Sequence, residues 1–151
     1  MSHMTIGVIV SGKDAEDATG RAEGIMEELL NRTSAYENYS LDEEDLPKPV
    51  KVLSKEGKKA VKKLWGQYMA DLKAALYDIR GEMDLNDDDA TLNHKDNFRY
   101  ACYRIGTFEG GPITLYDCGG AGVREKRDLT AALCKRGDGN DVWLVSVDVR
   151  T

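Results

Sequence analysis

The end of the chain carries its clearest alternation of apolar and polar positions, since residues 141–149 read DVWLVSVDV. Successive side chains of a strand point to opposite faces, so Trp143 to Val149 at odd positions form an apolar face. Ser146 and Asp148 turn the other face polar. The pattern predicts a terminal strand with one covered face and a need for partner strands.

Three further segments have the composition of strands, namely residues 5–10, 99–105 and 113–118. The first should lie close to the terminal strand. The other two are separated by residues 106–112, whose glycines and proline favour a hairpin. Gly7 and Gly12 would let another group approach the first strand closely, although tight packing and a turn explain them as well.

Helical spacing of apolar residues predicts three helices. The first follows Asp14 or Asp17 as its cap and ends near residues 31–34. The longest covers residues 55–80, with Ser54 as its cap and Gly81 as its stop, and the last covers residues 127–134. Residues 35–53 show neither period and contain two prolines, so we interpret them as an ordered crossing segment.

These elements predict a single α+β domain over residues 4–151, with residues 1–3 as a tag remnant. Their order is that of a ferredoxin-like, four-stranded antiparallel sheet with an enlarged helical first crossover. Two helical layers should cover one face and leave the other open or available for association. Helix 55–80 would be roughly 40 Å long, which exceeds a small domain and makes a homodimer one expectation.

Composition and charge narrow the possible functions. The net charge of -6 weighs against nucleic-acid binding, although lysines gather in residues 48–63 and acids in residues 82–96. Three cysteines without a close pair, no charged-then-apolar leader and no long apolar run predict a cytoplasmic protein.

Several kinds of chemistry are disfavoured by the residues present. His94 is the only histidine outside the tag remnant, which argues against histidine-dependent nucleophilic sites, including a dyad with Cys102, and against most zinc sites. The acidic run at residues 84–89 fails as a calcium loop, because Asp89 stands where glycine is needed and Lys95 where the bidentate glutamate belongs. Cys102, Cys118 and Cys134 fall in predicted elements, where small thiols are commonly buried. We therefore expect no metal, no cofactor and no catalytic residue.

A glycine-rich turn after residues 113–118 is the first candidate site. Converging amide groups, a helix amino end and basic side chains could bind a phosphate or carboxylate, although the same turn would serve merely to reverse the chain. The turn matches neither nucleotide-binding glycine motif. The candidate ligand-binding residues are Gly119, Gly120, Gly122, Arg124, Lys126 and Arg127.

A lysine stripe on the long helix is the second candidate. Its members fall on one helical side next to the apolar side, which suits an acidic partner as well as simple solubility. The partner could be a protein, a nucleic acid or the acidic loop of a second copy. The candidate partner-binding residues are Lys55, Lys58, Lys59, Lys62 and Trp65.

Two parts of the chain resemble a known group. The run from Leu29 to Asn38 and the closing strand at residues 141–149 are similar to the two ends of small uncharacterised proteins encoded by tailed bacteriophages. The resemblance implies a phage accessory protein that acts in the host cytoplasm. Such proteins often bind host or defence factors.

The sequence thus favours a non-enzymatic binding or regulatory protein that acts through a protein-protein surface. The alternative is a binder of a small anionic ligand or nucleotide, either a sequestering protein or a phosphate-handling enzyme, that uses the loop at residues 119–127.

Overall fold

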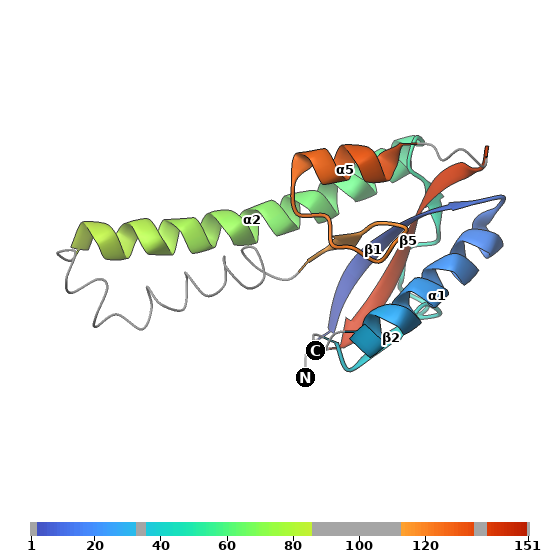
Figure 1. The fold of residues 1–151 in the computed structure, drawn as a ribbon, viewed down its shortest axis with the longest axis horizontal. Coiled ribbons are helices and arrows are strands. Elements are labelled where there is room, and N and C mark those ends of the chain that lie inside the picture. Colours follow the sequence, from blue (N-terminus) through green and yellow to red (C-terminus); the bar gives the residue numbers. More distant parts are fainter. Residues whose placement is uncertain (1–2, 33–35, 86–112, 135–138, 151) are drawn as a thin grey trace. The chain divides into compact units, whose positions relative to one another are not determined.

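The computed structural model describes residues 3–32, 36–85, 113–134 and 139–150 (Figure 1). The chain divides into two compact units. One consists of residues 1–64 and 114–151, and the other of residues 65–113. Predicted strand 99–105 and its hairpin, the acidic run from residue 86 onward, His94 and Cys102 lie outside the described residues.

The two terminal strands form the centre of the first unit. Strand β1 (His3–Gly12) pairs antiparallel with β5 (Asp141–Arg150) over its whole length, with Val8 opposite Val145. Ile6, Val8 and Val147 are fully buried. The predicted pairing of the chain's two ends is therefore confirmed.

The sheet is mixed and, among the described residues, contains five strands. Short strand β4 (Leu115–Tyr116) runs parallel to β1. Strands β2 (Asn38–Ser40) and β3 (Val50–Lys51) both pair antiparallel with β5. The α+β class is confirmed, but the ferredoxin-like, all-antiparallel sheet is not, because the chain re-enters the sheet at β4 in the same direction as β1.

Helices cover both faces of this sheet, contrary to the prediction that both helical layers cover one face. A Cβ at Gly12 would meet Ala18 of helix α1 (Ala15–Arg32), whereas a Cβ at Gly7 would meet Leu64 of helix α2 (Lys55–Leu85). Even and odd strand positions face opposite sides, so α1 and this part of α2 lie on opposite faces (Figure 1). Residues 142–147 are consequently all buried, Ser146 included.

Two predicted boundaries need correction. Residues 35–53 contain β2 and β3, which are only three and two residues long and too short to show a period. Helix α2 continues past Gly81 and ends at Leu85. The last helix, α5 (Lys126–Leu133), lies within one residue of its predicted bounds. No helix in the described part of the chain is both long and apolar enough to cross a bilayer.

Candidate functional site

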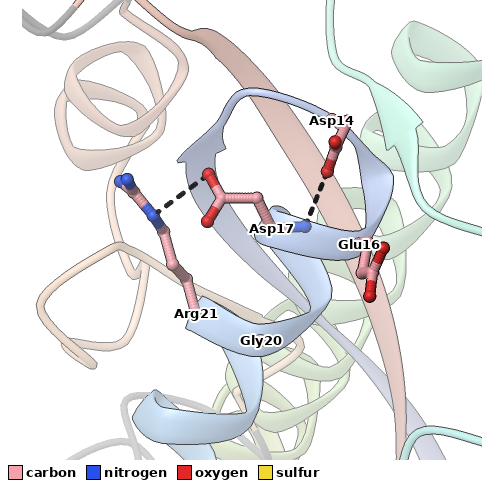
Figure 2. A pocket seen from close by; sticks show the side chains of 5 residues that line it. All are labelled: Asp14, Glu16, Asp17, Gly20 and Arg21. Carbon is pink, nitrogen blue, oxygen red and sulfur yellow. Dashed lines mark hydrogen bonds and ion pairs between the residues drawn. The ribbon is translucent and has the colours of Figure 1, made fainter.

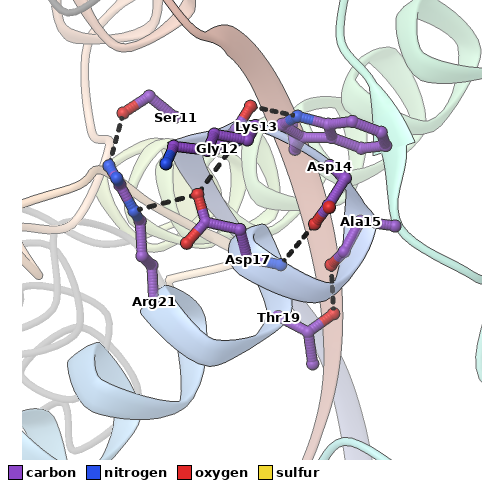
Figure 3. Close-up of polar contacts among 9 residues, drawn as sticks. Ser11, Gly12, Lys13, Asp14, Ala15, Asp17, Thr19 and Arg21 are labelled. Atoms are coloured by element: carbon purple, nitrogen blue, oxygen red, sulfur yellow. Dashed lines mark hydrogen bonds and ion pairs between the residues drawn. The ribbon is translucent and has the colours of Figure 1, made fainter.

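The junction of β1 and α1 holds a network of polar side chains. Asp14 caps the helix, because its Oδ1 accepts a hydrogen bond from the Asp17 amide at 2.8 Å. Asp17 Oδ2 accepts in turn from the Lys13 amide at 2.9 Å. Figure 3 shows these contacts together with the Arg21 side chain, which reaches back toward the end of β1. The predicted role of Asp14 is thus confirmed.

Arg21 is the cation of this network. Its Nη1 donates to Ser11 Oγ at 3.0 Å, and its Nε lies 3.6 Å from Asp17 Oδ2. Ser11 is buried, whereas the Arg21 side chain keeps 43% of its exposure. The guanidinium group is therefore held in place while one side still faces solvent.

A shallow pocket of about 490 Å³ lies at the amino end of α1 (Figure 2). It is lined by Asp14, Glu16, Asp17, Gly20 and Arg21. Three carboxylates against one guanidinium make it unsuitable for an anion. The acids instead complement the partial positive charge of the helix end, which is a structural role.

A second groove, of about 290 Å³, lies between α1 and the turn after β4. Ser11, Arg21, Glu28 and Cys118 line it with smaller apolar neighbours. Because β1 and β4 are parallel, their carboxyl ends meet at this edge, where open sheets commonly bind ligands. The structure thus brings the end of β1 next to the start of the glycine-rich turn.

The amide groups of the glycine-rich turn form hydrogen bonds within the turn itself. Asp117 Oδ1 accepts hydrogen bonds from the Gly119 and Ala121 amides at 2.9 and 3.0 Å, and the Asp117 carbonyl accepts from Gly120 at 3.0 Å. Gly120 has a φ of 77°, which favours glycine, and Gly122 bridges back to Tyr116. An anion would have to replace a carboxylate that already occupies these donors. Anion binding at Gly119, Gly120 and Gly122 stays a prediction.

The basic residues of the same candidate site follow the glycine-rich turn, and one of them is paired within the chain. Arg127 pairs with Glu125 at 3.2 Å, and both side chains are largely exposed. Glu125 and Asp128 form a capping box at the amino end of α5, so carboxylates already occupy that end. Lys126 is exposed, and Arg124 lies close enough to Tyr116 to oppose part of the rise that burial causes in the pKa of that phenol.

A buried tyrosine pair supports the glycine-rich turn. The hydroxyl groups of Tyr36 and Tyr116 lie 2.7 Å apart, and their rings meet edge to face. Burial raises the pKa of both phenols, and for Tyr116 the neighbouring Arg124 and Arg32 only partly oppose this rise. Arg32 also donates to the Gly120 carbonyl at 2.6 Å. These contacts give the neutral tyrosines a structural role.

The lysine face is defined as Lys55, Lys58, Lys59 and Lys62, all of which are exposed. Within the described residues, none of these ammonium groups has an ion-pair partner. Leu53, directly before the helix, is 76% exposed. Trp65 belongs to the other unit, where it is half-buried and its ring lies 5.7 Å from that of Tyr68.

The backbone beneath the lysine face is firmly anchored. Ser54 Oγ accepts from the Gly57 amide at 3.0 Å, which confirms Ser54 as the helix cap. A Cβ at Gly57 would lie 1.9 Å from the Lys51 carbonyl oxygen, so only glycine lets the helix pack here. Val61 is buried, and Leu64 accepts a hydrogen bond from Thr114 Oγ1 at 2.7 Å.

The thiols do not behave as expected. Cys118 and Cys134 are both exposed, so the expectation of burial is wrong for both. Cys118 lies in the turn after β4, and Cys134 caps the carboxyl end of α5. The described residues contain no cluster of metal-ligating side chains.

Two groove-lining residues were missed by sequence reasoning. Arg21 and Glu28 look like ordinary solvated positions of an amphipathic helix. Their separation of seven residues, which puts them on one side of α1, was the available signal.

Comparison with known proteins gives the family. The model of a family described as "Domain of unknown function (DUF7995)" matches residues 2–151, and the chain therefore belongs to this family. No curated protein and no solved structure matches the chain.

Proposed function

We propose that this member of the DUF7995 family is a non-enzymatic binding protein whose lysine face contacts an acidic protein. The single observation that carries the proposal is the exposure of four lysines, without described ion-pair partners, on an anchored stretch of helix. Charges without an internal partner remain available to an external one. In contrast, the amide donors of the glycine-rich turn are bonded within the chain.

The anchoring matters because binding is weakened when a surface has to be ordered first. The Ser54 cap, the close approach at Gly57 and the buried Val61 fix the first turns of α2 before a partner arrives. Exposed Leu53, two residues before the helix, offers an apolar contact close to its start. Lysines with an apolar residue nearby in the chain suit a protein surface that combines carboxylates with a small apolar depression.

The nature of the partner follows from two further considerations. Net charge -6 disfavours a long nucleic acid, because its phosphates would extend beyond the lysine face and be repelled there, whereas a protein can confine its carboxylates to the contact. The resemblance of both chain ends to phage proteins extends the proposal to a phage accessory protein and a host or defence factor as the target. That extension rests on the resemblance alone.

The proposal is tested with two matched charge reversals. Lys58→Glu with Lys62→Glu alters the lysine face, and Lys13→Glu with Lys48→Glu alters two exposed lysines elsewhere. Proteins captured from a bacterial lysate, and binding of polyglutamate as a defined acidic probe, should be lost with the first pair and kept with the second. Equal behaviour of the two variants, or no captured protein, would reject the proposal.

A second candidate function is the binding of a small anionic ligand or nucleotide. The observation that favours it is the fixed guanidinium group of Arg21 in the groove that Cys118 also lines, at the carboxyl ends of β1 and β4. Phosphate and a nucleotide panel should then raise the melting temperature. The amide resonances of residues 118–126 should shift in the same titration, and unchanged spectra at millimolar ligand would exclude this function.

A further inference from the structure

A third groove, of about 500 Å³, lies between α1 and β2. Thr19, Glu23 and Glu27 of the helix form one wall, and residues 38–42 form the other. Strand β2 is the outermost strand on its side of the described sheet. The groove therefore lies between a helix and an outermost strand of the sheet, and the Tyr39 hydroxyl group bonds to Glu27 across it.

The side chains that line this groove carry only negative charge. Glu23, Glu27 and Asp42 contribute carboxylates, and neither lysine nor arginine is present among the lining residues. The next three residues of the chain, 43–45, are also acidic and exposed. An occupant must therefore be cationic to be bound rather than repelled.

The spacing of the helical carboxylates selects an extended occupant. Glu23 and Glu27 are four residues apart on α1, which separates them by roughly 6 Å along the helix axis. Alternate side chains of an extended peptide are roughly 6.6 Å apart. Cations at every second position would thus meet the two carboxylates in turn, whereas adjacent cations would point to opposite sides.

Two of the carboxylates are already held in position. The Tyr39 hydroxyl group donates to Glu27 Oε1 at 2.5 Å, and Ser40 Oγ donates to Asp42 Oδ1 at 2.8 Å. The Tyr39 amide is bonded to the Asn38 side chain at 2.8 Å. Recognition therefore depends on side chains more than on main-chain pairing at Tyr39.

We propose that the groove between α1 and β2 binds an extended peptide segment with basic residues at alternate positions. The site is separate from the lysine face and has the opposite charge preference, so its partner is a different one.

The test uses two labelled peptides of equal composition and the full chain: GTKTKTKTG has alternating lysines, and GTKKTTTKG has no two lysines two positions apart. Fluorescence anisotropy should show tighter binding of the alternating peptide, and binding should weaken with salt. Glu23→Gln with Glu27→Gln should weaken it about tenfold, since each exposed ion pair contributes a few-fold.

Three controls make the result decisive. Glu16→Gln with Glu28→Gln removes the same charge from exposed positions of α1 outside the groove and should change binding less than twofold. The Lys58→Glu and Lys62→Glu variant should bind the peptide as the wild type does, which separates this site from the proposed lysine-face function. Equal affinity for both peptides, equal loss in both glutamine variants, or self-association abolished by the Glu23 and Glu27 changes would overturn the proposal.

Discussion

The glycine-rich turn and the lysine face differ in where their polar groups find partners. In the turn, the Asp117 side chain accepts two amide hydrogen bonds, and Arg32 donates to the Gly120 carbonyl. Tyr116 of the buried tyrosine pair lies directly before the turn. On the lysine face, an anchored backbone presents four ammonium groups without described ion pairs. Polar groups bonded within the chain stabilise the fold, whereas those without internal bonds can serve a partner. Sequence motifs of both kinds look equally functional until these bonds are known.

The largest loss of stability is expected for Gly57→Ala, which disturbs the close backbone contact beneath the lysine face. The new Cβ would lie 1.9 Å from the Lys51 carbonyl oxygen and 2.9 Å from the Val52 Cα, so backbone must move. We expect a loss of about 3 kcal/mol in the free energy of unfolding, measured by urea denaturation. Partner capture should fall as well.

Gly66→Ala is the matched control in the same helix. A Cβ there meets nothing within 4 Å, so the substitution should stabilise the protein by about 0.5–1 kcal/mol through helix propensity. If Gly57→Ala were as harmless as this control, the lysine face would not depend on a fixed backbone.

Asp117→Ala tests the internal bonding of the glycine-rich turn. It leaves the Gly119 and Ala121 amides without their acceptor, and we expect a loss of about 1–2 kcal/mol in the free energy of unfolding. Asp45→Ala, an exposed acid without a described contact, should cost less than 0.5 kcal/mol. Phosphate should perturb the amide resonances of Asp117→Ala more than those of the wild type. A stable Asp117→Ala protein would show that the turn does not need its own carboxylate.

The tyrosine pair predicts a dependence on pH. Both phenols have a pKa above the ordinary value of 10.0 in the folded state. The unfolded chain therefore releases these protons first, so the stability is complete below about pH 10 and falls as the pH rises further. Tyr36→Phe with Tyr116→Phe should flatten this fall in urea denaturation curves recorded at increasing pH.

Each single tyrosine-to-phenylalanine substitution should lower the free energy of unfolding, and the two losses should not add up in the double variant. Tyr116→Phe leaves the Tyr36 hydroxyl group without this partner in a buried site, at about 1–2 kcal/mol, whereas removing both hydroxyl groups should cost less than the sum. Tyr39, whose pKa rises to about 12 through partial burial and Glu27, keeps some pH dependence in the double variant. A strictly additive double variant would mean that the two hydroxyl groups are independent.

The predictable parts of the fold have local causes. Period-two alternation identified β5, and a serine followed by helical spacing located the start of α2, because cap chemistry acts within one turn. Burial of both sheet faces was not predictable, since Ser146 looks like a solvent-facing residue but is only 9% exposed. The parallel direction of β4 depends on how the chain returns from residues far away, which no local pattern encodes.

The candidate sites also divide into those that a local sequence pattern predicts and those that depend on distant parts of the chain. Lysines on one helical side were visible in the sequence because α2 is regular. The third groove was not, since Glu23 and Glu27 resemble any solvated helix positions until β2 is placed beside them. The glycine-rich turn was visible, but its use of Asp117 as an internal acceptor depends on a turn conformation that glycine content alone does not specify.

The smallest change in stability is expected where the change in binding should be largest. Lys58→Gln with Lys62→Gln removes two charges that have no described ion pair, so the free energy of unfolding should change by less than 0.5 kcal/mol. Lys51→Gln is the contrast, because Lys51 Nζ lies 3.1 Å from Asp141 and over the Trp143 ring, and its loss should cost up to about 1 kcal/mol. Polyglutamate binding should show the reverse order. If the Lys58 and Lys62 variant instead lost stability and kept its binding, these lysines would belong with the internally bonded groups, and the distinction between the two regions would fail.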